Sequence, residues 1–116
     1  MEKYIKKREF TVCGVGFCPT TKEEFVQEAF NLPTEPVSAS INLIGVPGVI
    51  SAKEDSNVFE VYSHCSFAAI DGMPIVKIAR KKGFSAERCA APDVMGLIFQ
   101  ESIAQKKTHF FLWREG

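Results

Sequence analysis

The sequence predicts an α/β fold, a Rossmann-like layered domain with a mainly parallel sheet. Short apolar runs bounded by turn-forming residues are typical of buried strands, and they alternate along the chain with segments of helical periodicity. Such alternation of strands and helices indicates a parallel sheet covered by helices. The chain has 116 residues, of which 46% are hydrophobic, so we expect a single domain over 1–116 with one core.

The first third of the chain supplies two of the expected strands. Residues 10–17 alternate loosely between apolar and small side chains and predict the first strand. Thr21 and Glu24 have the spacing of a capping box, which predicts a helix that ends near Phe30. A loop with two prolines then leads to a second strand over 38–46.

The middle of the chain predicts short helices followed by a buried strand. After a Pro-Gly pair that marks a turn or a helix start, residues 49–53 are expected to be helical. Asp55 or Ser56 is expected to cap a further helix over 57–63. The apolar run 67–70 predicts the third strand.

The last third of the chain predicts two helices and a fourth strand. A helix over 73–82 has three basic residues in its last turn and ends at Gly83. Pro92 and Asp93 suit the first turn of a second helix. Residues 109–113 predict the fourth strand, and we expect the fold to be truncated after it, because the chain ends where the next βα loop of such a sheet begins.

Composition excludes several classes of function. The 14 basic and 14 acidic residues balance, which argues against nucleic acid as a partner. The four cysteines form no CxxC pair and no zinc spacing with the two histidines, so we expect no metal site. We expect the cysteines to be free thiols in a reducing cytoplasm. The charged N-terminus predicts no signal peptide, and the lack of an apolar run of about 20 residues limits any membrane association to the periphery.

Asp71 is the candidate catalytic residue that the pattern itself singles out. It follows the apolar strand 67–70 and precedes Gly72 and Pro74. Ligands of open α/β sheets bind beyond the carboxyl ends of the strands, where a carboxylate can act as a general base. Asp is also a common helix N-cap, so capping of the helix that starts near Pro74 is the alternative interpretation.

Several motifs around this turn occur together. They are Ala52-Lys53-Glu54-Asp55, Asp71-Gly72-Met73-Pro74, Glu87-Arg88, Pro92-Asp93-Val94-Met95 and Phe110-Phe111-Leu112. In combination they resemble the WecG/TagA/CpsF family of bacterial glycosyltransferases. The similarity covers almost all of this chain and about the first half of a family member.

The resemblance implies an inverting glycosyltransferase of cell-surface polysaccharide synthesis, including exopolysaccharide. Such an enzyme transfers a hexose or an N-acetylhexosamine, for example N-acetylmannosamine, from a UDP-sugar to a polyprenyl-diphosphate-linked sugar. The implied partners are therefore the UDP-sugar donor and the lipid-linked acceptor, with no cofactor and no metal. The implied location is the cytoplasm, with peripheral attachment to the inner face of the cell membrane.

The resemblance also assigns roles to individual residues. Asp71 is implied as the general base, with Gly72 of the same turn in the substrate site. Arg88 is implied to bind the diphosphate, and its alternative is a surface ion pair with Glu87 or Asp93. Asp93 is placed in the substrate site chiefly as a helix-start residue that orients it.

Some positions depart from the family pattern. Leu43, Gly45 and Pro47 stand where the family has polar residues, and none of them offers a side-chain hydrogen-bond donor. Gly45 is nevertheless placed in the substrate site by its position. Trp113 and Arg114 replace a Gly-Gly pair, where bulky side chains would crowd a nucleotide.

These departures keep a second hypothesis open. The chain is then a truncated, catalytically inactive relative that acts as a binding or interaction protein, or that needs a separate second half. This hypothesis predicts an exposed apolar sheet edge or patch, covered in a homo-oligomer or by a partner chain that completes the fold. A weaker third interpretation is a nucleotide- or thiol-regulated binding module that uses Gly14, Gly16 and Cys13.

Overall fold

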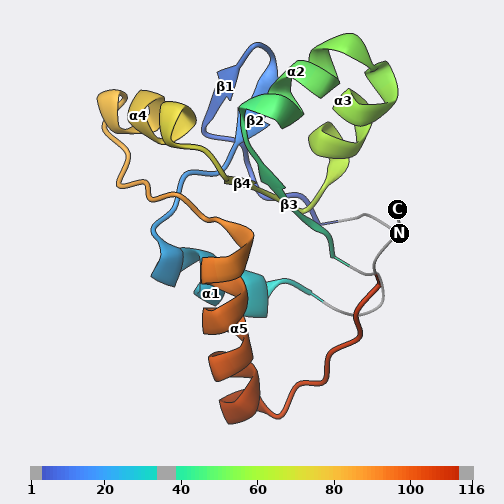
Figure 1. Cartoon of the computed structure of the whole chain (residues 1–116), viewed down its shortest axis with the longest axis vertical. Coiled ribbons are helices and arrows are strands. Elements are labelled where there is room, and N and C mark those ends of the chain that lie inside the picture. The colour runs from blue at the N-terminus through green and yellow to red at the C-terminus, as the bar shows by residue number, and fades with distance from the viewer. Residues whose placement is uncertain (1–3, 34–38, 113–116) are drawn as a thin grey trace.

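The computed structural model describes residues 4–33 and 39–112, and the chain has a mixed α/β fold in this part (Figure 1). Its elements follow in the order β1 (Phe10–Val12), β2 (Val15–Phe17), α1 (Lys22–Asn31), β3 (Ile41–Ile44), α2 (Val46–Glu54), α3 (Ser56–His64), β4 (Phe67–Ile70), α4 (Met73–Lys81) and α5 (Ala91–Gln105).

The centre of the molecule is a parallel pair of strands. β3 and β4 run in the same direction, in a register that pairs Ile41 with Phe67 and Ile44 with Ile70. The helical segment α2–α3 connects them, as parallel strands require. The predicted α/β class and parallel pairing are therefore confirmed, while a larger sheet of the Rossmann type stays a prediction.

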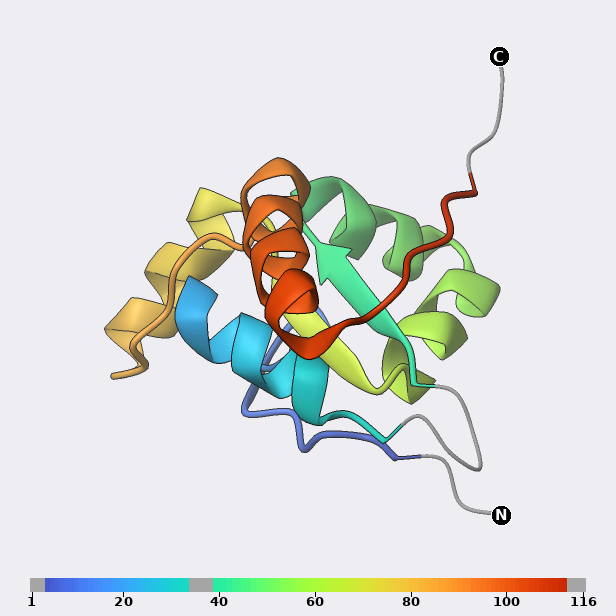
Figure 2. The same cartoon turned by 90° about the horizontal axis from the view of Figure 1, so that it is seen from below.

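Both faces of this pair are covered, because side chains along β4 alternate between two buried clusters. Ala68 and Ile70 belong to a cluster with β1, β2, α2 and α4, and Phe67 and Ala69 belong to a cluster with α1 and α5. Figures 1 and 2 show α1 and α5 side by side, on the side of the strands away from α2 and the β1–β2 hairpin. All four residues of β4 are buried, which explains their continuous apolar run in the sequence.

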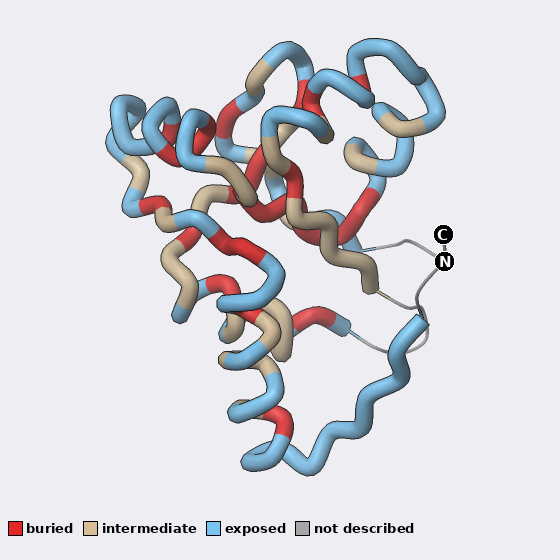
Figure 3. Tube along the Cα trace, viewed as in Figure 1, coloured by how far each residue is buried: buried red, intermediate tan, exposed pale blue. Residues whose placement is uncertain are grey.

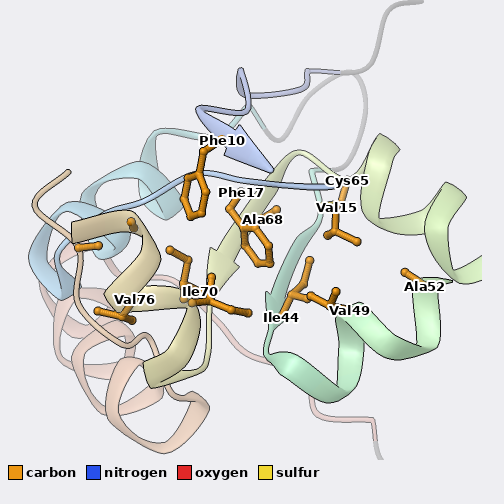
Figure 4. Close-up of a cluster of buried hydrophobic side chains, with 13 residues drawn as sticks. Phe10, Val15, Phe17, Ile44, Val49, Ala52, Cys65, Ala68, Ile70 and Val76 are labelled. Atoms are coloured by element: carbon orange, nitrogen blue, oxygen red, sulfur yellow. The ribbon is translucent and has the colours of Figure 1, made fainter. Parts of the chain in front are cut away.

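The first cluster is the larger one and is shown in Figure 4. Its aromatic members Phe10 and Phe17 stack with ring centroids 5.7 Å apart, and Ile44, Ala68 and Ile70 come from the parallel strands. In the second cluster, Phe25 of α1 meets Phe67 of β4 edge to face at 5.6 Å. These contacts fix the helices against the strands that carry the candidate site.

The predicted single strand over 10–17 is wrong, because this segment forms the antiparallel hairpin β1–β2. Its turn residues Cys13 and Gly14 both have positive φ, of 49° and 83°. Two consecutive positive φ values are the signature of the type I′ turn that joins two-residue hairpins. Gly14 was the available sequence signal for this turn. It was missed because Cys13 stands before it, where such turns usually have Asn or Asp.

The predicted fourth strand is also wrong over residues 109–112, which have no regular secondary structure. Phe110 is 90% exposed and Leu112 is 89% exposed, so the apolar pattern of this segment does not reflect burial here. Figure 3 shows the exposed segment after α5 in pale blue. Trp113, the last residue of the predicted strand, lies outside the described residues.

The helix signals read from the sequence are confirmed. The Thr21 hydroxyl accepts a bond from the Glu24 N–H at 3.2 Å, and the Glu24 carboxylate accepts from the Thr21 N–H at 2.8 Å. Asp55 caps α3, and Gly83 follows α4 with a φ of +93°. Helix α2 begins earlier than expected, at Val46, because a proline is well accommodated in the first turn of a helix.

Candidate functional site

Asp71 lies at the carboxyl end of the parallel pair and does not cap the following helix. Its N–H donates to the carbonyl of Ile44 at 2.9 Å, which continues the pairing of β3 with β4. The N-cap of α4 is Gly72, and no side chain caps this helix. The capping interpretation is therefore wrong, and the Asp71 carboxylate instead accepts a bond from Arg88 Nε at 3.2 Å.

Arg88 reaches Asp71 because backbone bonds on both sides fix its position. The Cys89 N–H donates to the carbonyl of Ile70 at 2.8 Å, and the Glu87 N–H donates to the carbonyl of Thr20 at 2.9 Å. The loop before α5 is thus held beside the end of β4. The side chains of the resulting pair are 54% exposed for Arg88 and 28% exposed for Asp71, so solvent and substrates can reach them.

The alternative interpretation of Arg88, a surface ion pair with Glu87 or Asp93, is wrong, because both carboxylates have other partners. Glu87 accepts a bond from the backbone N–H of Lys22 at 2.9 Å. Asp93 lies 3.6 Å from the ammonium group of the same lysine. Glu87 therefore connects the loop before α5 to the start of α1, and Asp93 connects the first turn of α5 to the same place. A direct substrate contact of Asp93 stays a prediction.

Gly45 and Gly72 bring the loops after β3 and β4 into close contact. A Cβ atom on Gly45 would lie 2.6 Å from the backbone oxygen of Asp71, and one on Gly72 would lie 3.5 Å from the Cα of Gly45. Only glycine fits at position 45, because the carbonyl that it faces belongs to the backbone and has no rotamer by which to move away. This packing gives Gly45 a structural role at the site, and substrate binding by either glycine stays a prediction.

Three helices begin near this edge without a side-chain cap. Their N-caps are Gly45 for α2, Gly72 for α4 and Ala90 for α5, and each helix has a proline in its first turn. The backbone N–H groups of an uncapped first turn and the positive end of the helix dipole favour a bound anion. Sequence reasoning missed this shared feature, although a small residue two positions before a proline recurs at all three helix starts.

Three hollows of the surface lie elsewhere, along α1 and α5, and neither Asp71 nor Arg88 lines any of them. The exposure of the Asp71 and Arg88 side chains places this pair at an accessible edge of the molecule. Within the described residues, no group of three or more His, Cys, Asp or Glu side chains is arranged to hold a metal ion. The expectation of catalysis without metal or cofactor stays a prediction.

Comparison with known families identifies the chain. The family model described as "Glycosyl transferase WecG/TagA/CpsF family" matches residues 10–113, a range that includes every residue of the candidate site. The chain belongs to this family. No curated protein and no solved structure matches it.

Membership of the WecG/TagA/CpsF family makes the chain a glycosyltransferase relative of cell-surface polysaccharide synthesis, with a sugar donor and a sugar acceptor as substrates. The resemblance stated from the sequence motifs is thus confirmed at the level of the family. Among the described helices of this WecG/TagA/CpsF protein, none has the length and apolar character needed to cross a membrane.

Proposed function

We propose that this chain carries the catalytic base of an inverting transfer of a hexose or an N-acetylhexosamine from a UDP-sugar to a polyprenyl-diphosphate-linked sugar. The observation that supports it most directly is the accessible Asp71–Arg88 pair at the carboxyl end of β3 and β4, in a chain of this glycosyltransferase family. We propose the cytoplasmic side of the membrane as its place of action, because the acceptor is lipid-linked.

Asp71 has one oxygen positioned and one available. Oδ1 accepts the bond from Arg88, and the described residues offer no partner to Oδ2. In the proposed reaction the acceptor hydroxyl oxygen attacks the anomeric carbon from the face opposite the diphosphate. Its proton passes to Oδ2, the bond between the anomeric carbon and the UDP oxygen breaks, and UDP leaves with the electron pair.

Arg88 and the nearby helix starts suit the charge that develops on the leaving UDP. Arg88 uses only Nε for Asp71, and its two terminal nitrogens have no partner among the described residues. A guanidinium can therefore orient the base and contact a diphosphate at the same time. The uncapped N-termini of α2 and α4 add backbone donors at the same edge.

Asp71→Asn tests this proposal, with UDP-sugar turnover as the measurement. The substitution keeps the shape of the side chain and removes the proton acceptor, so we expect a loss of about 10²–10⁴-fold in turnover. Glu54→Gln, at an exposed position of α2, is the matched control and should keep full turnover. Undiminished transfer by Asp71→Asn, or no transfer by the folded wild-type chain with any UDP-hexose or UDP-N-acetylhexosamine, would overturn the proposal.

A specific observation also favours the second hypothesis, an interaction protein or a part that needs a protein partner. Within the described residues β3 pairs with β4 alone, so its other edge has no strand beside it. Ile103, Phe110 and Leu112 are more than 80% exposed. Light scattering at rising concentration tests this hypothesis, which expects association of the chain. A stable monomer that binds no dye specific for apolar surfaces would count against it.

A further inference from the structure

The two outer edges of the parallel strand pair differ in their hydrogen bonding. The outer edge of β4 is covered, because three of its carbonyls accept bonds of 2.8 Å from distant backbone N–H groups: Lys6 to Ser66, Cys18 to Ala68 and Cys89 to Ile70. Among the described residues, no backbone group donates to or accepts from the outer edge of β3. In this part of the chain β3 is therefore the open side of the sheet.

The open edge of β3 offers two hydrogen-bond donors and two acceptors. The carbonyls of Ser40 and Ile44 accept bonds from β4, so the even-numbered residues of this segment direct their backbone groups toward β4. The alternate residues, Ile41 and Leu43, therefore direct their N–H and C=O groups outward. Both residues are half-buried, so solvent or another chain can reach them.

The residues of β3 lack the usual protection of an exposed strand edge. Ile41-Asn42-Leu43-Ile44 contains neither a charged side chain nor a proline, both of which discourage pairing with another strand. The half-buried amide of Asn42 has no partner among the described residues, whereas the neighbouring Ser40 exchanges bonds with Ser66. An unpartnered amide in an otherwise apolar strand is explained when a second strand supplies its partner.

We propose that β3 pairs antiparallel with β3 of a second copy of this chain, about a twofold axis at Asn42. Ile41 then lies opposite Leu43 of the second copy, and each outward N–H meets an outward C=O. The two Asn42 amides face each other at the axis. A second copy is favoured over a different protein because this pairing is self-complementary, and because a formal net charge of zero gives no overall repulsion between copies.

The resulting sheet has the strand order β4-β3-β3-β4 and leaves the candidate catalytic site free. Asp71 follows the carboxyl end of β4, and antiparallel copies place these ends at opposite edges of the sheet. The inference builds on the association proposed above for the open edge and names its occupant. It does not depend on sugar transfer, so its tests measure association alone.

Sedimentation velocity of the full chain tests the proposal at concentrations up to about 1 mM, the weak end of specific association. We expect a concentration-dependent equilibrium between monomer and dimer. Asn42→Asp places two carboxylates opposite each other at the axis and should weaken the dimer about tenfold. Asn57→Asp adds the same charge at an exposed position of α3, so it is the matched control and should leave the dimer unchanged.

A mixture of two variants tests the twofold axis itself. Asn42→Asp and Asn42→Lys together should form a tighter dimer than either variant alone, because opposite charges then meet at the axis. A wild-type chain that stays monomeric at about 1 mM would overturn the proposal. Equal dimerisation of Asn42→Asp and Asn57→Asp, or no gain on mixing, would also overturn it and assign any association to another surface.

A cysteine variant gives a second measurement that does not depend on charge. Directly opposed residues in a pair of this kind have Cα atoms about 4.5 Å apart, within the range of a disulfide. In a Cys13→Ser background the other three native cysteines are buried. Oxidised glutathione should therefore link Asn42→Cys chains into a covalent dimer and leave Asn57→Cys chains largely unlinked. Equal linking of the two variants, or none in Asn42→Cys, would contradict the inference.

Discussion

Gly45→Ala is expected to destabilise the fold and disturb Asp71 together. The added Cβ would lie 2.6 Å from the Asp71 carbonyl oxygen, about 0.8 Å short of the 3.4 Å at which ordinary contact begins. The two loops must separate, because the added Cβ and the carbonyl oxygen are both fixed to the backbone and neither can rotate away. Overpacking of this kind lowers the free energy of unfolding by about 1–3 kcal/mol. The smaller entropy of the unfolded chain offsets about 0.4–1 kcal/mol of this cost. We therefore expect a net loss of about 1–2 kcal/mol in the free energy of unfolding.

Urea unfolding followed by circular dichroism measures this loss, and Gly96→Ala is the matched control. A Cβ on Gly96 would meet nothing within 4 Å, and the residue lies inside α5, so alanine should stabilise the fold by about 0.5–1 kcal/mol. The same glycine-to-alanine substitution is thus expected to lower the free energy of unfolding at position 45 and to raise it at position 96. If Gly45→Ala unfolds at the same urea concentration as the wild type or higher, the close approach of the two loops is not a constraint and the reasoning is refuted.

Three further predictions concern the parts that hold the site. Thr21→Ala should lower the free energy of unfolding by about 1 kcal/mol in the same urea assay, because the capping box of α1 is lost; an unchanged midpoint would contradict this. Arg8→Met should lower the free energy of unfolding by about 3 kcal/mol. The Arg8 guanidinium donates to two carbonyls at the end of α3, at 3.0 and 2.7 Å, and both carbonyls would lose a charged donor. A smaller loss than that of the capping variant would argue against the contact. Burial raises the pKa of the Cys18 and Cys89 thiols, which keeps them neutral in the folded chain to a higher pH than in the unfolded chain. Stability is therefore complete below the ordinary thiol value of 9.0 and declines as the pH rises through the raised pKa values. A thiol reagent at neutral pH should label the exposed Cys13 long before these two, and equal labelling rates would refute the burial.

The helix caps and stops could be predicted from the sequence. The capping box at Thr21, the cap at Asp55 and the stop at Gly83 each depend on residues within a few positions of one another, and all three are confirmed. The fully apolar run 67–70 predicted a buried strand for the same reason, and all four residues of β4 are buried. The predictions for residues 10–17 and 109–112 were wrong, because both segments depart from local preference. The first contains a turn with an unusual cysteine, and the second is an apolar run that is exposed.

The sequence alone determined the α/β class, the order of the helices and the family, because apolar periodicity, capping residues and motif spacing are properties of neighbouring residues. It also placed Asp71 at a strand end, and left open whether that carboxylate caps a helix or serves chemistry. Only the tertiary structure showed that Asp71 does not cap α4 and is paired with Arg88, since the backbone bond from Cys89 to Ile70 brings Arg88 beside Asp71 from a distant part of the chain. The tight contact of Gly45 with Asp71 has the same origin, because it joins the loops after two strands that lie apart in the sequence.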